Sequence, residues 1–254
     1  MFVEERKQRI LNILKQKEKV SVNELSDLFS VSKVIIRKDL CNMEEENLLT
    51  RTHGGAILKR KLVDKIVLKD IAKEDLDEKT ELAEKVISLI KEKDIIFLDD
   101  STVTILVAAL LQKKKINITV ITNMLEIQKI LSENKGIEII SLGGVYDSRT
   151  DSFIGEMARQ NLECFNPNKV FIGIGGINVD KMQISTCTID EGKFKNTALQ
   201  VGQECFIITQ SKKFFQDSIF NFSKLKDGMT IITDKNIPSD IEDKLIENGI
   251  KIIK

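Results

Sequence analysis

The chain has 254 residues, of which 42% are hydrophobic and 31% are charged. This composition is typical of a folded globular protein and excludes an intrinsically disordered or fibrous chain. Lys plus Arg and Asp plus Glu both total 39, so the net charge of zero indicates neither an anionic nor a cationic partner. His53 is the single histidine, which excludes metal sites that need two histidine ligands. We expect no metal and no cofactor.

The N-terminal segment becomes charged at once and lacks the apolar core of a signal peptide. No run reaches the roughly 18 consecutive apolar residues that a membrane-spanning helix needs. The four cysteines are scattered and form no C-x-x-C pair, so we expect reduced, packed thiols at Cys41, Cys164, Cys187 and Cys205. These features predict a cytoplasmic protein with no membrane partner.

The zero net charge conceals a difference between the two ends of the chain. Residues 1–60 hold 12 basic and 9 acidic residues, whereas residues 61–254 hold 27 and 30. The same point separates short helical patterns from a region in which apolar strands alternate with helices. The segment between them is rich in Lys, Asp and Glu, which is typical of a charged, partly helical connector. We predict domains at 1–58 and 77–254, joined by a connector at 59–76.

Two short helices are predicted first. An apolar stripe over residues 4–16 indicates the first helix. The segment that starts at Ser21 is a capping box, in which the Ser21 hydroxyl accepts a hydrogen bond from the backbone N–H of Glu24. It predicts a second helix, whose inward-facing apolar residues are expected to be Leu25, Leu28 and Phe29.

A tight turn at residues 30–32 precedes a third helix, which Ser32 can cap. Its predicted buried face has apolar residues at i, i+4 and i+7, namely Ile36, Leu40 and Met43. Its other face carries basic and small side chains near the N-terminal end, namely Lys33, Val34, Arg37 and Lys38. Two helices joined by a tight turn, with such a face on the second, indicate a helix-turn-helix that enters the DNA major groove.

Residues 48–58 contain two short β-prone runs separated by Gly54-Gly55, which predicts a two-stranded wing against the DNA backbone. By spacing alone, a three-helix packing or dimerisation module with solvated charges remains an alternative. We interpret His53 as a wing residue and not as a catalyst, because no Ser or Cys nucleophile lies in a recognisable elbow beside it.

The segments Ile36-Arg37-Lys38-Asp39-Leu40 and His53-Gly54-Gly55-Ala56 resemble the winged helix-turn-helix of the DeoR family of bacterial transcriptional regulators. The family pattern is V-S-x-x-T-I-R-R-D-L followed by L-x-R-x-H-G-G-A. This chain has Ile35, Lys38 and Asn47 where the family has Thr, Arg and Gly. The resemblance implies binding to double-stranded operator DNA. The implied contacts are Ser21, Ser32, Lys33, Val34, Arg37, Lys38, Arg51, His53, Gly54 and Gly55.

Strand and helix patterns alternate after about residue 80. Apolar, mostly β-branched runs predict strands at 95–98, 118–122, 137–141, 169–173, 205–209, 229–233 and 251–253. Helical patterns lie between several of them, at 80–91, 103–112, 124–132, 152–163, 189–200 and 240–247. This alternation predicts an α/β fold with a mostly parallel sheet and helices on both faces. Ligands of such folds bind beyond the carboxyl ends of the strands.

Polar residues follow several of these predicted strand ends. The segment from Asp99 to Thr104 opens a helix, where hydroxyls and backbone N–H groups can hold a phosphate. The glycines at 143–144 and 173–176 are interpreted as turns, although they could also let the backbone approach a ligand. No segment fits the G-x-G-x-x-G or P-loop patterns of nucleotide sites. Lys213 is either the cation that faces a phosphate or one more solvated lysine.

This half also resembles the DeoR family, whose sensor domain is similar in fold to ribose-5-phosphate isomerase, glucosamine-6-phosphate deaminase and CoA transferases. Residues 99–104 stand where the family has D-S-G-T-T-T, and Glu191 with Lys195 matches an E-A-x-x-K block. The resemblance implies a small phosphorylated sugar as effector. The candidate contacts are Asp99, Ser101, Thr102, Thr104, Thr122, Asn123, Gly143, Gly144, Glu191 and Lys213.

The departures from the family pattern fall at this expected effector site, where Asp100 and Ser101 replace Ser and Gly, and Gln210 replaces Asp. An extra carboxylate opposes phosphate binding unless it points away or pairs with Lys213. We expect a repressor of a sugar-metabolism operon that is not an enzyme. It should act as a homodimer or higher homo-oligomer, because one such domain reads too few bases for a unique site. The alternative is a sugar-phosphate isomerase or deaminase with an accessory N-terminal domain.

Overall fold

The computed structural model describes residues 3–17, 19–46, 48–58, 61–63 and 74–254. The chain divides into two compact units, Met1–Lys61 and Leu62–Lys254. Within the expected connector, residues 61–63 form strand β4 (Lys61–Val63) and not a helix, and residues 74–75 form a turn before α5. The rest of the connector prediction lies outside the described residues.

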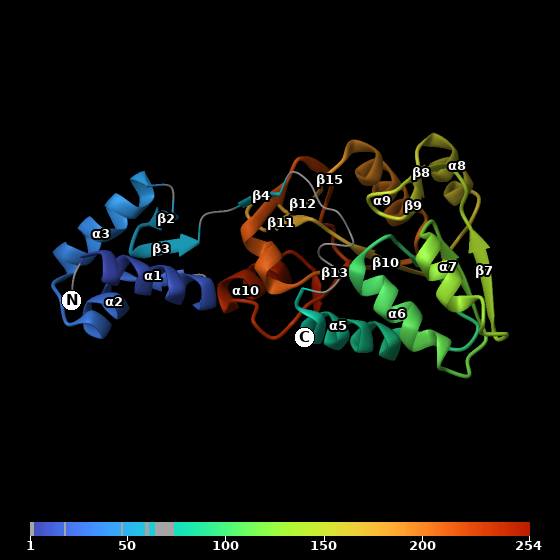
Figure 1. Cartoon of the computed structure of the whole chain (residues 1–254), viewed down its shortest axis with the longest axis horizontal. Helices are drawn as coiled ribbons and strands as arrows, with labels where there is room; N and C mark the ends of the chain where they lie inside the picture. Colours follow the sequence, from blue (N-terminus) through green and yellow to red (C-terminus); the bar gives the residue numbers. More distant parts are fainter. Residues whose placement is uncertain (1–2, 18, 47, 59–60, 64–73) are drawn as a thin grey trace. The chain divides into compact units, whose positions relative to one another are not determined.

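The smaller unit is a winged helix-turn-helix. Its elements are α1 (Val3–Lys17), β1 (Lys19–Ser21), α2 (Val22–Phe29), α3 (Lys33–Glu45), β2 (Leu49–Thr52) and β3 (Gly55–Leu58) (Figure 1). The strands form an antiparallel sheet in the order β1-β3-β2. The wing of β2 and β3 is as predicted, whereas β1 has only three residues and therefore too short a pattern to be recognised in the sequence.

Three serines mark the helix boundaries of this unit. The Ser21 hydroxyl accepts a hydrogen bond from the Glu24 backbone N–H at 3.0 Å at the start of α2. Ser30 ends α2 in the left-handed conformation, with a φ of 53°. The Ser32 hydroxyl accepts from the Ile35 N–H at 3.4 Å at the start of α3. An N-cap of this kind stabilises a helix by about 1 kcal/mol.

One hydrophobic core holds these helices and the sheet together. The buried face of α3 is as predicted, with an exposure of 1% or less at Ile36, Leu40 and Met43. Helix α2 buries Val22 and Leu25 and half-buries Phe29, but Leu28 is 60% exposed, so the prediction that Leu28 faces inward is wrong. The buried residues lie at i, i+3 and i+7, and Leu28 falls outside that stripe.

The larger unit is an α/β domain built on a seven-stranded sheet. In spatial order the strands are β17 (Lys251–Ile253), β16 (Thr230–Ile232), β13 (Glu204–Ile208), β10 (Lys169–Gly173), β5 (Ile95–Leu98), β6 (Ile118–Thr122) and β7 (Ile137–Ser141). All neighbouring strands are parallel. Each corresponds to a predicted strand, because a strand covered on both faces is a continuous apolar run.

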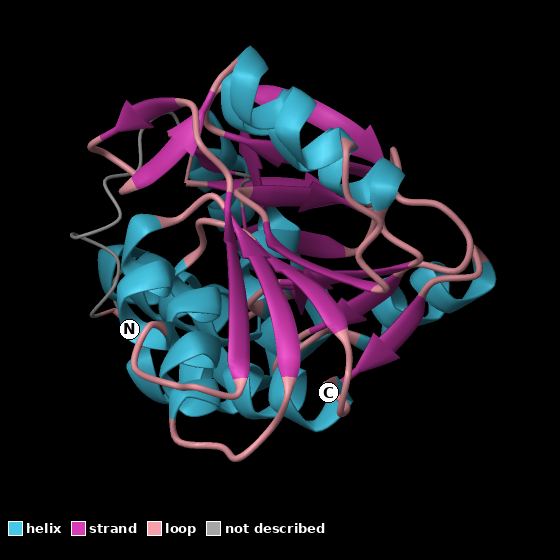
Figure 2. Cartoon of the chain, turned by 90° about the vertical axis from the view of Figure 1, so that its right-hand side faces the viewer, coloured by secondary structure: helices cyan, strands magenta, loops and turns pink. Residues whose placement is uncertain are grey.

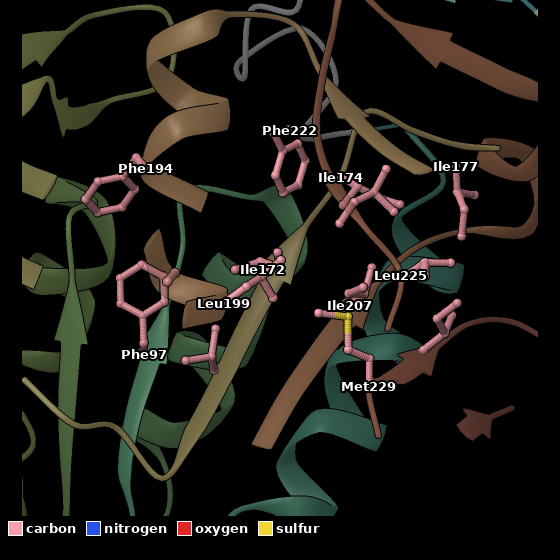
Figure 3. Packing of buried hydrophobic residues seen from close by; sticks show 14 of the residues in the cluster. Phe97, Ile172, Ile174, Ile177, Phe194, Leu199, Ile207, Phe222, Leu225 and Met229 are labelled. Carbon is pink, nitrogen blue, oxygen red and sulfur yellow. The ribbon is translucent and has the colours of Figure 1, made fainter. Parts of the chain in front are cut away.

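Helices cover both faces of this sheet (Figure 2). One face packs against α5 (Leu76–Leu89), α6 (Thr102–Gln112) and α7 (Leu125–Leu131). The other face packs against α8 (Glu156–Glu163), α9 (Ile189–Val201) and α10 (Ser239–Glu247). On β5, Ile96 and Leu98 point to the first face and Phe97 to the second. Phe97 packs on Phe194 of α9, with ring centroids 5.9 Å apart (Figure 3).

Further short strands of the larger unit lie outside this sheet and are not predicted by the sequence. They are β8 (Val145–Asp147), β9 (Ser152–Ile154), β11 (Gly176–Asn178), β12 (Gln183–Thr186), β14 (Gln216–Ser218) and β15 (Phe220–Lys224). The predicted helix at 152–163 begins too early. Residues 152–154 form β9, which pairs with β8, and α8 begins only at Glu156. No helix in the described part of the chain is long and apolar enough to cross a membrane.

Candidate functional site

The first candidate site is the exposed face of α3. It carries four of the predicted DNA contacts as exposed side chains, namely Lys33, Val34, Arg37 and Lys38. Ser21 and Ser32 are also exposed, but their hydroxyls cap α2 and α3. The two serines therefore position the helices, and the longer side chains of α3 form the surface that can reach DNA.

A buried ion pair holds α3 against α1. Asp39 is 3% exposed, and its carboxylate accepts two hydrogen bonds from Arg6: Nη2 donates to Oδ1 at 3.0 Å and Nε donates to Oδ2. Bidentate pairs of this kind fix geometry as well as adding energy. Because Asp39 adjoins Lys38 in the chain, the pair orients the segment of α3 that carries the exposed cations.

The wing presents three predicted DNA contacts as exposed residues, Arg51, His53 and Gly54. The Arg51 backbone N–H donates to Glu44 Oε1 at 2.8 Å, which ties the wing to α3. Gly55 is buried, and a Cβ atom there would lie 1.8 Å from the carbonyl oxygen of Val20. This glycine therefore lets β3 pack closely against β1, and its contact with DNA stays a prediction.

The second candidate site lies beyond the carboxyl ends of β5 and β10 in the larger unit. The buried ammonium of Lys195 donates to Asp99 Oδ2 at 2.6 Å and to the Gly173 carbonyl oxygen at 3.1 Å. Asp99 Oδ2 also accepts from the Gly173 N–H at 2.7 Å. A Cβ atom on Gly173 would lie 2.5 Å from Ser101 Cβ, so this glycine, the last residue of β10, serves a close approach to the start of α6 and not the predicted turn. Asp99 is fully buried and holds the loop in place, and its role as an effector contact stays a prediction.

Two further carboxylates surround the same ammonium. Asp100 Oδ1 and Glu191 Oε1 each lie 3.3 Å from Lys195 Nζ. The Ser152 hydroxyl donates to Asp100 Oδ2 at 2.8 Å. The extra carboxylate of this chain therefore points into the domain, toward Lys195 and Ser152, instead of pairing with Lys213.

Burial changes the pKa values of two carboxyl groups around Lys195. It raises the pKa of Asp99 and of Glu191 above their usual ranges. Burial alone would lower the pKa of Lys195, but Asp99, Asp100 and Glu191 together raise it well above its ordinary value. The ammonium is therefore charged at physiological pH, and the two acids with raised pKa values take up protons as the pH falls.

Helix α6 begins at the same place, where its N-terminal end favours an anion. Ser101 and Thr102 are half-buried there, and the Ser101 hydroxyl caps the helix by accepting from the Thr104 N–H at 3.4 Å. Thr104 is fully buried, with its hydroxyl 2.8 Å from the Asp99 carbonyl oxygen and 2.7 Å from that of Ser101. Thr104 thus shapes the loop, and its role as an effector contact stays a prediction.

Lys213 is half-buried in the short 3-10 helix η1 (Ser211–Phe215), and its ammonium donates to the Ile174 carbonyl oxygen at 2.6 Å. Burial and the nearby charge of Lys195 lower the pKa of Lys213 to about 8. A bound anion would favour the charged form of this lysine and raise its pKa again.

The ends of β6 and β7 supply four more predicted residues. Thr122 and Asn123 are fully buried: the Thr122 hydroxyl accepts from the Met124 N–H at 3.1 Å, and Asn123 Nδ2 donates to the Phe153 carbonyl oxygen at 3.1 Å. Both side chains support the strand ends, and Asn123 Oδ1 is buried without a hydrogen-bond partner among the described residues, so their role as effector contacts stays a prediction. Two glycines after β7 are half-buried, Gly143 and Gly144.

Gln210 directs its side chain to the start of α5. Its Nε2 donates to Glu78 Oε2 at 2.6 Å and to Asp75 Oδ2 at 3.3 Å, and Lys212 also pairs with Asp75. The loop that precedes Lys213 is therefore fastened to the first turn of α5, which follows the connector.

Sequence reasoning missed the central position of Lys195 and the role of Ser152. Lys195 lies one helical turn after Glu191, so the i,i+4 spacing of an acid and a base was an available signal. Ser152 carries no such signal, because its partner Asp100 is 52 residues away in the chain.

Comparison with known proteins finds relatives that are similar to this chain over nearly its whole length. The lactose phosphotransferase system repressor of Lactococcus lactis subsp. lactis is 35% identical over 244 residues, which cover 94% of each chain. The HTH-type transcriptional repressor GlcR of Bacillus subtilis (strain 168) is 30% identical and covers 100% of this chain and 96% of its own. The putative aga operon transcriptional repressor of Escherichia coli O157:H7 is 28% identical over 98% of this chain and 93% of its own.

Among solved structures, ribose 5-phosphate isomerase A from Methanocaldococcus jannaschii aligns with 57% of this chain and 56% of its own, with a TM-score of 0.41 and 11% identity. An overlap of this size says nothing about the ligand of this chain. Two family models together match a larger part of this chain. The DeoR-like helix-turn-helix domain matches residues 6–61, and the DeoR C terminal sensor domain matches residues 74–235. The chain belongs to the DeoR family of bacterial transcriptional regulators.

Proposed function

We propose that this protein represses a sugar-metabolism operon by binding operator DNA, and that a phosphorylated sugar bound to its larger unit releases the DNA. The observation that carries the proposal is the exposed face of α3, where Lys33, Arg37 and Lys38 lie opposite a buried apolar face. Cations on such a helix contact phosphates and guanine edges. The relatives include a lactose phosphotransferase system repressor and a putative aga operon repressor, and these names support a role in sugar metabolism.

A gel-shift titration of the full-length protein on the DNA upstream of its own gene tests the DNA-binding part. Arg37→Ala should weaken binding by about 10-fold to 100-fold, because one base or phosphate contact of an arginine contributes roughly 1–3 kcal/mol. Lys113→Ala removes an exposed cation from the larger unit and should leave the affinity unchanged. Binding no tighter than to random DNA at the same salt concentration would refute the repressor proposal.

For the effector, the proposed contacts are the residues of the second site that are at least partly accessible, namely Ser101, Thr102, Gly143, Gly144, Glu191 and Lys213. The N-terminal end of α6 and the Lys213 ammonium would hold the phosphate, and the Glu191 carboxyl group could bond a sugar hydroxyl. A thermal-shift screen of phosphorylated sugars tests this site, since a ligand at 100 times its Kd stabilises by about 2.7 kcal/mol.

The ligand must also change DNA affinity. Lys213→Ala should keep the operator affinity but abolish release by the sugar that the screen identifies. A ligand can act in this way only if it binds one arrangement of the protein better than another. If Lys213→Ala responds to the ligand as the unaltered protein does, the effector site has been misplaced.

The proposal includes a homodimer or larger homo-oligomer, because one recognition helix reads too few base pairs for a unique genomic site. Light scattering of the purified protein measures this oligomeric state.

The proposal also retains the predicted domains at 1–58 and 77–254 and the predicted connector at 59–76. The enzyme alternative predicts turnover of the sugar phosphates used in the screen, so product analysis of the same mixtures separates the two functions.

A further inference from the structure

One apolar side chain lies in the middle of the basic face of α3. Val34 is 71% exposed in the first turn of this helix. At 3.6 residues per turn, Arg37 and Lys38 follow it at i+3 and i+4 and flank it on either side. The N-terminal residues of a recognition helix are the ones that reach base edges in the major groove. The isopropyl group is therefore exposed to water at the place where this fold reads DNA.

The chemistry of valine restricts what this side chain can read. An isopropyl group neither donates nor accepts a hydrogen bond, so it cannot distinguish the nitrogen and oxygen atoms of base edges. The major groove offers one apolar group, the C5-methyl of thymine. Contact between the two removes both from water, which favours binding by about fourfold for each methyl buried. Against cytosine, the same side chain would desolvate the N4 amine without giving it a partner.

We infer that Val34 reads the methyl group of a thymine in each operator half-site, with the cations beside it contacting guanine edges or phosphates. Ile35, which is 41% exposed at the next position, extends the apolar patch along the first turn. The inference rests on the proposed DNA-binding function and specifies part of the sequence that the protein selects. Val34 is a specificity-determining residue in this assignment, and the exposed cations supply most of the affinity.

The experiment uses the full-length protein and a duplex selected by it from a random library. Each thymine of that duplex is replaced in turn by deoxyuridine, which removes the methyl group and keeps the hydrogen-bonding edge. At one thymine in each half-site, the substitution should weaken binding to the unaltered protein by about fourfold. Val34→Ala should lose this sensitivity, and Val34→Thr, which retains one methyl, should keep part of it.

Leu28→Ala is the matched control, because it removes an apolar side chain that is 60% exposed on α2 and should leave the sensitivity to uracil unchanged. Thermal unfolding of Val34→Ala should match that of the unaltered protein, since the side chain is exposed. The inference is overturned if every thymine tolerates uracil, or if Val34→Ala stays sensitive at the same position. A library from which no sequence is enriched would instead overturn the DNA-binding function on which the inference rests.

Discussion

Replacing Lys195 with methionine tests whether the stability of the larger unit depends on the ammonium group that pairs with Asp99, Asp100 and Glu191. Lys195 is 2% exposed, and its Nζ lies within 3.3 Å of Asp99, Asp100 and Glu191. Lys195→Met leaves the buried carboxylates of Asp99 and Asp100, and the partly accessible one of Glu191, without their cation, which should destabilise the unit by about 3–5 kcal/mol. At roughly 2–4 °C for each kcal/mol in a domain of this size, the melting temperature should fall by about 6–20 °C.

Thermal unfolding followed by circular dichroism at pH 7 measures this loss. Lys193→Met replaces an exposed lysine two positions earlier on α9 and should change stability by less than about 0.5 kcal/mol. The loss should shrink as the pH falls from 7 toward the ordinary Asp pKa of about 3.9. Burial already raises the pKa of Asp99, and removal of the ammonium raises it further. The folded variant then holds a proton that the unfolded chain releases, so lower pH stabilises the variant relative to the unaltered protein.

Lys195 and Asp99 should also be energetically coupled. In an Asp99→Asn background, Lys195→Met should cost less than it does alone, because one of the unpaired carboxylates is absent. A loss below about 1 kcal/mol for Lys195→Met, or an equal loss in both backgrounds, would refute the assignment of Lys195 as the partner of these acids.

Three other predictions concern the remaining contacts. Arg6→Met should destabilise the smaller unit by about 3–5 kcal/mol in urea unfolding, because it leaves the Asp39 carboxylate buried without its partner; an unchanged midpoint would contradict this. The affinity for inorganic phosphate, measured by calorimetry, should fall as the pH rises from 7 to 9, because the pKa of Lys213 is about 8 and the neutral amine attracts no anion. Lys213→Ala should abolish that pH dependence. Gln210→Ala removes the hydrogen bond to Glu78 and should lower stability by about 1 kcal/mol and speed proteolysis at the start of α5; unaltered cleavage there would show that this contact does not hold the helix.

Parts of the protein that depend on neighbouring residues could be predicted from the order of the amino acids. The hydroxyls of Ser21 and Ser32 cap helices because the N–H groups that they bond lie three residues ahead. The seven strands of the large sheet were predictable because burial on both faces requires continuous apolar runs. The exposed basic face of α3 follows from the same reasoning, since a buried apolar face on one side of a helix leaves the other side to solvent.

Which of the polar residues near the strand ends are accessible depends on the folded arrangement of the whole larger unit. Asp99, Thr104 and Asn123 are fully buried, although their residue types and positions suit a ligand contact. Their burial depends on partners far away in the chain: Asp99 bonds Lys195 across 96 positions, and Asn123 bonds Phe153 across 30. Such pairs arise when the folded chain brings strand ends, α9 and β9 together. A pattern of neighbouring residues does not encode contacts between such distant segments, so the residues that support the proposed effector site can be identified only from the fold.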